Sequence, residues 1–381
     1  MIQSVGGYWR PINGLARLLE ELGELADGIE SRDEGFSHDK LAEEFADIWI
    51  ISTCTANQFN IDLSSQQAPD GPVPVGVASL LSRAGWIARI LNYYDGPKNP
   101  RSVADWPSLG AAIATFHVAL RRLAEEFKVD VDAAVDAKIE MTPERDVGRF
   151  QQSFDPSTAE TVDGFERLRL KTPCTLAKRA KLWGAPPWRA NWPAFMNVDA
   201  LVPYLTVFAK AADREGLDGF VVAPPGEIEN QGMPGLATWF REFLELLVQN
   251  DTPSDRPDAL TDINRPGWQF SYHGVRMFIS VFSSLYPANH PRHSAVGPYV
   301  LFQPESSFDA HGIGSRHPSS ARLKQSIRRQ FASAGLDYPS EIIDQRVEAA
   351  IYLLPRWRGD SEVRWWVRAP ESDRRLPLKQ S

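Results

Sequence analysis

Hydrophobic residues recur three and four positions apart in two stretches near the beginning of the chain. This spacing places them on one side of an α-helix, so each stretch predicts an amphipathic helix. A polar segment at 33–37 separates the two stretches and predicts a loop between antiparallel neighbours. The stripe positions are Leu15, Leu18, Leu22, Leu25 and Ile29 in the first helix and Leu41, Phe45, Ile48, Ser52 and Phe59 in the second.

A second pair of helices is predicted further along, and its sequence is similar to the first. The segment LLEELGELADGI, which starts at Leu18, aligns with LLSRAGWIARIL, which starts at Leu80, and NQFNIDL aligns with EEFKVDV. We therefore predict helices over 78–90 and 109–127 and an internal duplication of a two-helix unit. The alternative is that two unrelated amphipathic hairpins share a general pattern. A further short helix is expected within 131–150.

After residue 150 helical and strand-like patterns alternate, which is typical of an α+β domain. A polar stretch at 151–165 predicts a linker between domains at 1–150 and 166–381. His273 and Gly274 lie between two strand-like runs and predict a hairpin turn. The sequence thus predicts a multidomain protein, with an N-terminal all-α helical bundle followed by an α+β domain. The expected helices are 199–214, 235–250, 319–333 and 345–353, and the expected strands are 219–223, 268–272, 276–283 and 299–303.

Composition narrows the function without identifying it. The 381 residues are 43% hydrophobic and 24% charged, which is typical of a folded globular protein. A net charge of −8 argues against stable nucleic-acid binding, which needs a basic surface. No apolar run approaches the length of a membrane span, and no signal peptide is evident, so we expect a cytoplasmic protein without membrane contact. The two cysteines fall in different predicted domains, which makes a disulfide improbable.

Four acidic residues lie on the flanks of the first two predicted helices. They form two pairs, and the three-residue spacing within each pair keeps both acids on one helix face. Both pairs fall on the same flank of their apolar stripes, so docking the stripes brings four carboxylates together. A hard divalent cation, Mg²⁺ or Mn²⁺, would relieve their repulsion. The alternative is two solvated acidic faces. The expected metal ligands are Glu21, Glu24, Glu44 and Asp47.

These acids carry a resemblance to a known family. The motif EExxE at 20–24, followed by ExxD at 44–47 and NIDL at 60–63, resembles the MazG-like all-α NTP pyrophosphohydrolases over residues 8–150. The resemblance implies a hydrolase that converts an NTP or dNTP to a nucleoside monophosphate and pyrophosphate. It implies that metal ions polarise the phosphoryl oxygens, while Glu20 or Glu43 orients or deprotonates the attacking water. A duplicated chain would mimic a MazG dimer with one acid site, and a homodimer stays compatible with it.

Four residues are candidates for contact with the nucleotide. Trp9 could stack on a base, although such an aromatic residue also packs against helix starts. In the second helix pair the acids are replaced, and Arg83 could reach substrate phosphates. The end of the bundle resembles the family's K-x-x-x-N-x-x-R ending, with Lys138 and Arg145 in place but Thr142 where the asparagine stands. The alternative for this ending is a basic helix terminus favoured by the helix dipole.

The second half of the chain carries another resemblance. The segments TPCT at 172–175, WQFSYHG at 268–274, YPANHPRHS at 286–294 and IRR at 327–329 resemble the YqcI/YcgG family over about residues 166–370. Some members of that family are haem-dependent N-hydroxylases of small molecules bearing guanidine or amine groups.

The resemblance points to a histidine-rich loop as the part that would carry haem. His290 is then the first choice for axial ligand and His293 the second, with Arg292 beside a propionate. Cys174 is an alternative thiolate ligand, or else a small buried residue. His290 could instead be a loop histidine bonded to backbone.

Three functions therefore remain open. The first is an NTP pyrophosphohydrolase with Mg²⁺ or Mn²⁺ as cofactor, fused to a domain of the haem-oxygenase type. The second is a haem-binding N-hydroxylase whose helical module only assembles or regulates. The third is a non-catalytic nucleotide sensor. The sequence does not identify the nucleobase, because pocket shape decides it.

Overall fold

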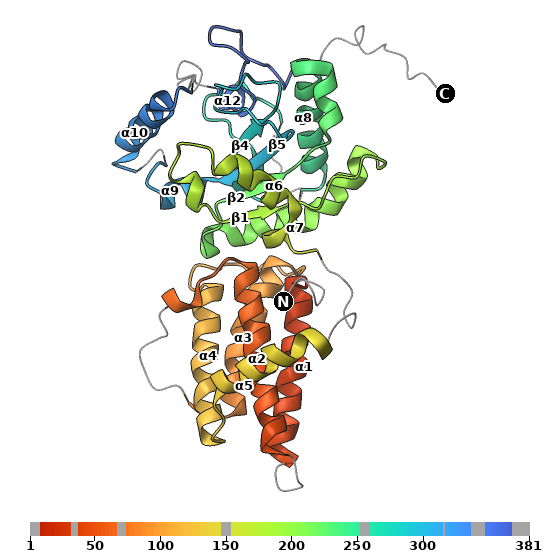
Figure 1. Ribbon diagram of the computed structural model, residues 1–381, viewed down its shortest axis with the longest axis vertical. Coiled ribbons are helices and arrows are strands. Elements are labelled where there is room, and N and C mark those ends of the chain that lie inside the picture. The colour runs from red at the N-terminus through yellow and green to blue at the C-terminus, as the bar shows by residue number, and fades with distance from the viewer. Residues whose placement is uncertain are drawn as a thin grey trace. The chain divides into compact units, whose positions relative to one another are not determined.

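The structure is a computed structural model that describes residues 8–31, 37–66, 74–145, 154–251, 260–314, 317–336 and 347–367 (Figure 1). The chain divides into two compact units. Unit 1 comprises Met1–Ala159 and Lys210–Leu217, and unit 2 comprises Glu160–Ala209 and Asp218–Ser381. Within the described ranges, no helix is long and apolar enough to cross a membrane.

Unit 1 is built from helices, as the hydrophobic spacing predicts. Ser37 and Ser108 cap two of them, because each hydroxyl accepts a hydrogen bond from the backbone N–H three residues on, at 3.2 Å and 3.1 Å. Packing joins α1 to α2 and α3 to α4, and α5 lies against α2. The bounds are α1 Pro11–Glu30, α2 His38–Gln58, α3 Val77–Tyr94, α4 Leu109–Glu126 and α5 Val131–Arg145.

Helices α2 and α4 each end in a turn of the same type. Asn60 and Lys128 follow them with φ angles of 54° and 58°, in the left-handed region. Ile61 N–H donates to Ala56 O at 3.0 Å, and the equivalent bond behind α4 measures 2.9 Å. Both turns are Schellman motifs, which satisfy the last carbonyl groups of a helix. They fall at matching places in the aligned segments NQFNIDL and EEFKVDV. The duplication itself stays a prediction.

Unit 2 is built around a mixed five-stranded sheet with the order β1-β2-β5-β4-β3 (Figure 1). Strand β1 runs parallel to β2, and the other neighbours are antiparallel. His273 and Gly274 join β3 to β4 with positive φ angles of 48° and 73°, which confirms the predicted hairpin turn. The strands are β1 Leu182–Gly184, β2 Gly219–Val222, β3 Ser271–Tyr272, β4 Val275–Phe282 and β5 Tyr299–Pro304.

Alternate residues of the central strands pack on opposite faces of the sheet. Phe302 of β5 contacts Phe243 of α8, with ring centres 6.0 Å apart. Its neighbour Leu301 belongs instead to a core cluster with Phe165 of α6. This two-residue period follows from strand geometry and fixes which side chains face α6. The helices of unit 2 are α6 Glu160–Arg169, α7 Ala194–Glu215, α8 Gly232–Gln249, α9 Glu305–Ala310, α10 Ser320–Ser333 and α12 Ala349–Tyr352. The last turns of α7, from Lys210 on, are assigned to unit 1.

Most predicted elements of unit 2 are present, but their lengths and the region before them differ. The strand expected over 268–272 is paired only at Ser271–Tyr272, and the helix expected over 345–353 is described only at Ala349–Tyr352. Helix α6 begins at Glu160, inside the segment where a linker is predicted. The sequence ETVDGFERLR hides this helix, because Thr161 and Phe165 are its only buried residues. Strand β1 and helix α9 are also absent from the sequence predictions.

Candidate functional site

Three of the predicted acidic ligands meet in unit 1. Oxygen atoms of Glu21 and Glu24 on α1 and Glu44 on α2 lie within 4.8 Å of one another. Their helical spacing turns them to the same side, because α1 and α2 pack along their apolar stripes. Glu21 is only 1% exposed, whereas Glu24 is exposed and Glu44 is half-buried. The cluster therefore reaches from the helix interface to solvent.

Two basic side chains flank the cluster. Arg17 pairs with Glu21 one turn along α1 and with Glu20 at 2.5 Å. Lys138 of α5 is 3% exposed, and its Nζ lies 2.6 Å from Asp47 Oδ2. Asp47 is absent from the group of three carboxylates that converge. The fourth predicted ligand, Asp47, is thus paired with a lysine. The spacing of the acids on the first two helices does not predict this pairing.

Burial and mutual repulsion make the cluster hard to ionise. Burial raises the pKa of Glu21 to about 8, and the charge of Asp47 adds to the effect while Arg17 opposes it. Burial also raises the pKa of Glu44 to about 7, with Glu24 and Asp47 contributing and Lys138 opposing. A carboxyl group whose pKa is raised this far keeps its proton at neutral pH unless a bound cation replaces the proton.

Two buried oxygens in the cluster lack hydrogen-bond partners. Glu21 Oε2 and Glu44 Oε2 accept no hydrogen bond from any residue that the structure describes. Unpaired buried oxygens cost free energy, and a hard divalent cation coordinated by oxygen would satisfy them. The donor set consists of carboxylates alone, which suits Mg²⁺ or Mn²⁺. The residues present therefore fit the predicted metal.

The two predicted catalytic acids lie at the rim. Glu20 has 55% of its side chain exposed and pairs with Arg17, and Glu43 has 49% exposed. The Nζ atom of Lys138 lies 3.3 Å from Glu43 Oε2. Both carboxylates are accessible to water and lie on the same helices as the predicted ligands. Neither is part of the converging group of three.

The predicted nucleotide contacts are not brought together by any described interaction. Lys138 alone reaches the acidic residues, where it acts as a counter-ion. The carbonyl of Trp9 accepts a hydrogen bond from Gln58 Nε2 at 2.8 Å. Arg83 donates to the backbone and hydroxyl of Ser79 in its own helix. The side chain of Arg145 lies outside the described residues.

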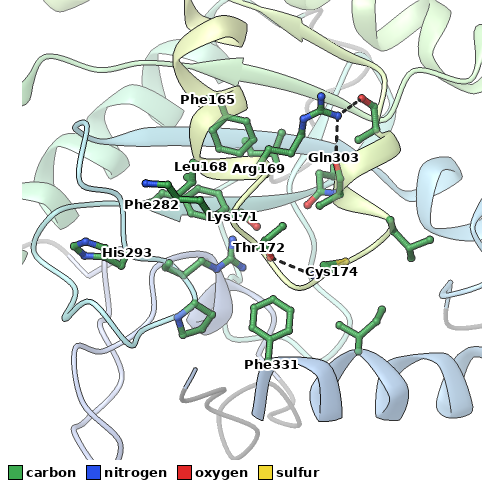
Figure 2. A pocket seen from close by; sticks show the side chains of 18 of the residues that line it. Phe165, Leu168, Arg169, Lys171, Thr172, Cys174, Phe282, His293, Gln303 and Phe331 are labelled. Atoms are coloured by element: carbon green, nitrogen blue, oxygen red, sulfur yellow. Dashed lines mark hydrogen bonds between the residues drawn. The ribbon is translucent and has the colours of Figure 1, made fainter. Parts of the chain in front are cut away.

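Unit 2 contains a cavity of about 420 Å³ beneath the histidine-rich loop. Figure 2 shows Phe165 and Leu168 from α6 and Phe331 from α10 around it, with Thr172 and Cys174 of the loop after α6. The predicted haem residues His290, Arg292 and His293 line the same cavity, as does Cys174. The loop that the sequence assigns to haem therefore borders a cavity, whereas haem binding itself stays a prediction.

The two histidines of the loop differ in which ring nitrogen carries the proton. Arg292 N–H donates to His290 Nδ1 at 3.1 Å, so a neutral His290 carries its proton on Nε2. Burial lowers the pKa of His290 to about 3, with Arg292 and His293 adding to the effect, which keeps the ring neutral. His293 Nδ1 lies 2.7 Å from the carbonyl oxygen of Tyr286 and must donate there, which leaves a lone pair on Nε2.

This arrangement favours His293 over His290 as a haem ligand, and the identity of the ligand stays a prediction. A ligating histidine donates its Nδ1–H and binds metal through the bare Nε2. His290 has the reverse tautomer, since its Nδ1 accepts a backbone hydrogen bond. It is the loop histidine bonded to backbone that the sequence left as the alternative. Only His293 of the pair has the polarity of a ligand, and haem binding stays a prediction.

The cavity also contains a pair that the sequence does not reveal. Asp218 Oδ1 accepts hydrogen bonds from Ser307 Oγ at 2.7 Å and His311 Nε2 at 2.8 Å. These residues are 89 and 93 positions from Asp218, so only the folded sheet brings them together.

The partner of Glu21 in unit 1, Arg17, could have been identified from sequence, because it stands four residues before Glu21 on one helix.

Comparison with known proteins identifies one part of the chain. Residues 171–344 match the model of the YqcI/YcgG family, so this part of the chain is a YqcI/YcgG family domain. A stretch of 70 residues is 37% identical to "Uncharacterized protein YpjD" of Bacillus subtilis (strain 168), over 17% of this chain and 61% of that relative. The chain thus covers less than two thirds of that relative's length. No solved structure matches the chain. Neither match names an NTP pyrophosphohydrolase, so the MazG-like resemblance stays a prediction.

Proposed function

We propose that unit 1 is a metal-dependent NTP pyrophosphohydrolase. The observation that carries the proposal is the convergence of Glu21, Glu24 and Glu44 within 4.8 Å around buried oxygens that no described residue satisfies. A solvated acidic face would leave such oxygens in contact with water, at no cost. Here the cost of burial is present and a cation would remove it.

The protein's own groups have separable roles in this proposal. Glu21, Glu24 and Glu44 would hold the cation, which would polarise phosphoryl oxygens and neutralise their charge. Glu20 and Glu43 are exposed beside this group, so either can accept the proton of the attacking water. Water then adds to the α-phosphorus and pyrophosphate leaves. Lys138 positions the carboxylates of Asp47 and Glu43 at the same edge.

The test is hydrolysis of an NTP and dNTP panel by the full chain with Mg²⁺ or Mn²⁺, scored as pyrophosphate released. Glu21→Gln and Glu44→Gln should lower turnover at least about 100-fold, because each removes a charged ligand. Glu126→Gln is the matched control, since Glu126 is an exposed acid at the end of α4. Full activity in both cluster variants would refute the proposal.

The same panel separates an enzyme from a sensor. A sensor would bind Mn²⁺ and nucleotide through the same carboxylates and release no pyrophosphate. Calorimetry with a non-hydrolysable triphosphate measures that binding directly. Haem binding by unit 2 is a separate prediction and is outside this proposal.

A further inference from the structure

The cavity of unit 2 has apolar walls. Aromatic and aliphatic side chains reach it from three directions: the helix α6, the strands β4 and β5, and the helix α10 (Figure 2). Its volume of about 420 Å³ is in the range of cavities that hold small molecules. Walls of this kind bury the hydrocarbon part of a ligand. The apolar lining includes Phe165, Phe278, Phe282, Leu301 and Phe331.

Basic side chains surround the apolar walls. Arg167 and Lys171 line the cavity and are exposed, so they stand where it opens to solvent. Neither side chain forms an ion pair or hydrogen bond with any residue in the described ranges. Arg292 also lines the cavity, with its guanidinium 5.0 Å from the centre of the Phe282 ring. Arg169 is different, because it is held by Glu166 and by backbone carbonyls.

The acidic group of the cavity already has hydrogen-bond donors. Among the described lining residues, Asp218 is the sole carboxylate. It accepts hydrogen bonds from Lys181 N–H at 2.8 Å, Ser307 Oγ at 2.7 Å and His311 Nε2 at 2.8 Å. A carboxylate with three donors has little need for a cationic ligand. The cavity therefore carries an excess of positive charge inside a chain whose net charge is −8.

We propose that this cavity binds a small organic acid, with its hydrocarbon body against the apolar walls and its carboxylate beside Arg167 and Lys171. An inorganic anion would not use the walls, and an amine would meet only like charge at the opening. The orientation of His311 adds a second feature. Its Nε2 is committed to Asp218, so Nδ1 offers a lone pair to a donor group on the ligand. The inference is independent of the function proposed for unit 1.

The test compares three probes with one hydrocarbon chain: octanoate, octan-1-ol and octylamine. Isothermal titration of the full chain should show that octanoate binds at least about 10-fold more tightly than octanol, with octylamine weakest. Raising the salt concentration should weaken octanoate and leave octanol unchanged, because salt screens only the charged contact.

Variants then locate the two halves of the site. Arg167→Gln with Lys171→Gln should weaken octanoate about 10-fold or more and leave octanol unchanged. Phe331→Ala should weaken both, since it removes part of the apolar wall. Arg322→Gln is the charge-matched control, because Arg322 is exposed on α10 and does not line the cavity. Circular dichroism confirms that each variant is folded.

Three results would overturn the proposal. They are equal binding of octanoate and octylamine, unchanged octanoate affinity in the folded double variant, and a cavity that takes up hemin while excluding octanoate. The last result would show that a large planar group occupies the space. Loss of pyrophosphate release in the cluster variants of unit 1 has no bearing on these measurements, so the two proposals fail separately.

Discussion

Lys138 Nζ lies 2.6 Å from Asp47 Oδ2, and the lysine is only 3% exposed. The contact joins α5 to α2 at the edge of the carboxylate cluster. A buried ammonium group is costly unless it is paired, and a crowded set of carboxylates is costly unless it is neutralised. Each group therefore stabilises the other, and Lys138 serves as an internal counter-ion.

Replacing this counter-ion should destabilise the metal-free protein. Lys138→Met keeps the length of the side chain and removes its charge, so Asp47 and Glu43 lose their partner. We expect a loss of about 1–2 kcal/mol in the free energy of unfolding, because the lysine is buried but its two carboxylate partners are partly exposed. Urea unfolding in EDTA measures it. Lys98→Met, at an exposed lysine, controls for the loss of a positive charge, and equal stability of Lys138→Met and wild type would contradict the role.

The raised pKa of Glu21 predicts an unusual dependence of stability on pH. The pKa of this carboxyl is about 8 in the folded chain and near 4.3 when unfolded, so between these values the folded state holds the extra proton. Stability without metal should fall as pH rises through that window, by up to about 1.4 kcal/mol per pH unit. Urea unfolding in EDTA at pH 6.0 and 8.5 should show this slope, and Glu21→Gln should make it shallower, with the remainder due to Glu44, whose pKa is raised to about 7. A parallel slope in the variant would exclude Glu21 as its source.

His117 predicts the opposite slope. Its ring stacks on Trp49 with centres 3.8 Å apart, and its Nε2 lies 2.8 Å from Ser52 Oγ. Burial lowers its pKa to about 3, with Arg121 adding to the effect. In the unfolded chain His117 takes up a proton near pH 6.5, whereas in the folded chain it stays neutral. The free energy of unfolding therefore decreases as pH falls below that value.

The expected loss for His117 is about 2 kcal/mol at pH 5. His117→Gln removes the titrating group and keeps a hydrogen-bonding side chain beside Ser52. Chemical unfolding at pH 7.5 and pH 5 should show a smaller difference for the variant than for wild type. The same acid loss in both proteins would assign it to other groups.

The sequence predicted the helices of unit 1 because their signal is local. The stripe that contains Leu18 and Leu22 repeats within one helix, and both residues are almost fully buried. The elements of unit 2 were harder to predict from the sequence, since β1 has only three residues and α6 buries only Thr161 and Phe165. Such elements are specified by long-range packing against the sheet, which a single sequence does not display.

The candidate sites show the same difference between local and long-range signals. Glu21 and Glu24 could be grouped from spacing, because one helix turn places them together. The pairing of Lys138 with Asp47 spans 91 positions, and that of His311 with Asp218 spans 93. The different hydrogen bonds of His290 and His293 arise from the backbone of one loop, which residue types alone do not determine.

The packing of α6 on the sheet gives the last prediction. A Cβ atom placed on Gly164 of α6 would lie 2.5 Å from Tyr299 Oη on β5, which is too close for a normal contact. Alanine is better than glycine in a helix by about 1 kcal/mol, so only this contact opposes the change. Gly164→Ala should therefore destabilise the wild type by about 1–3 kcal/mol. In the Tyr299→Phe background, which lacks the hydroxyl, the same change should be neutral or stabilising. A double-mutant cycle in urea measures the coupling. Additive effects would show that α6 shifts to accommodate the methyl group.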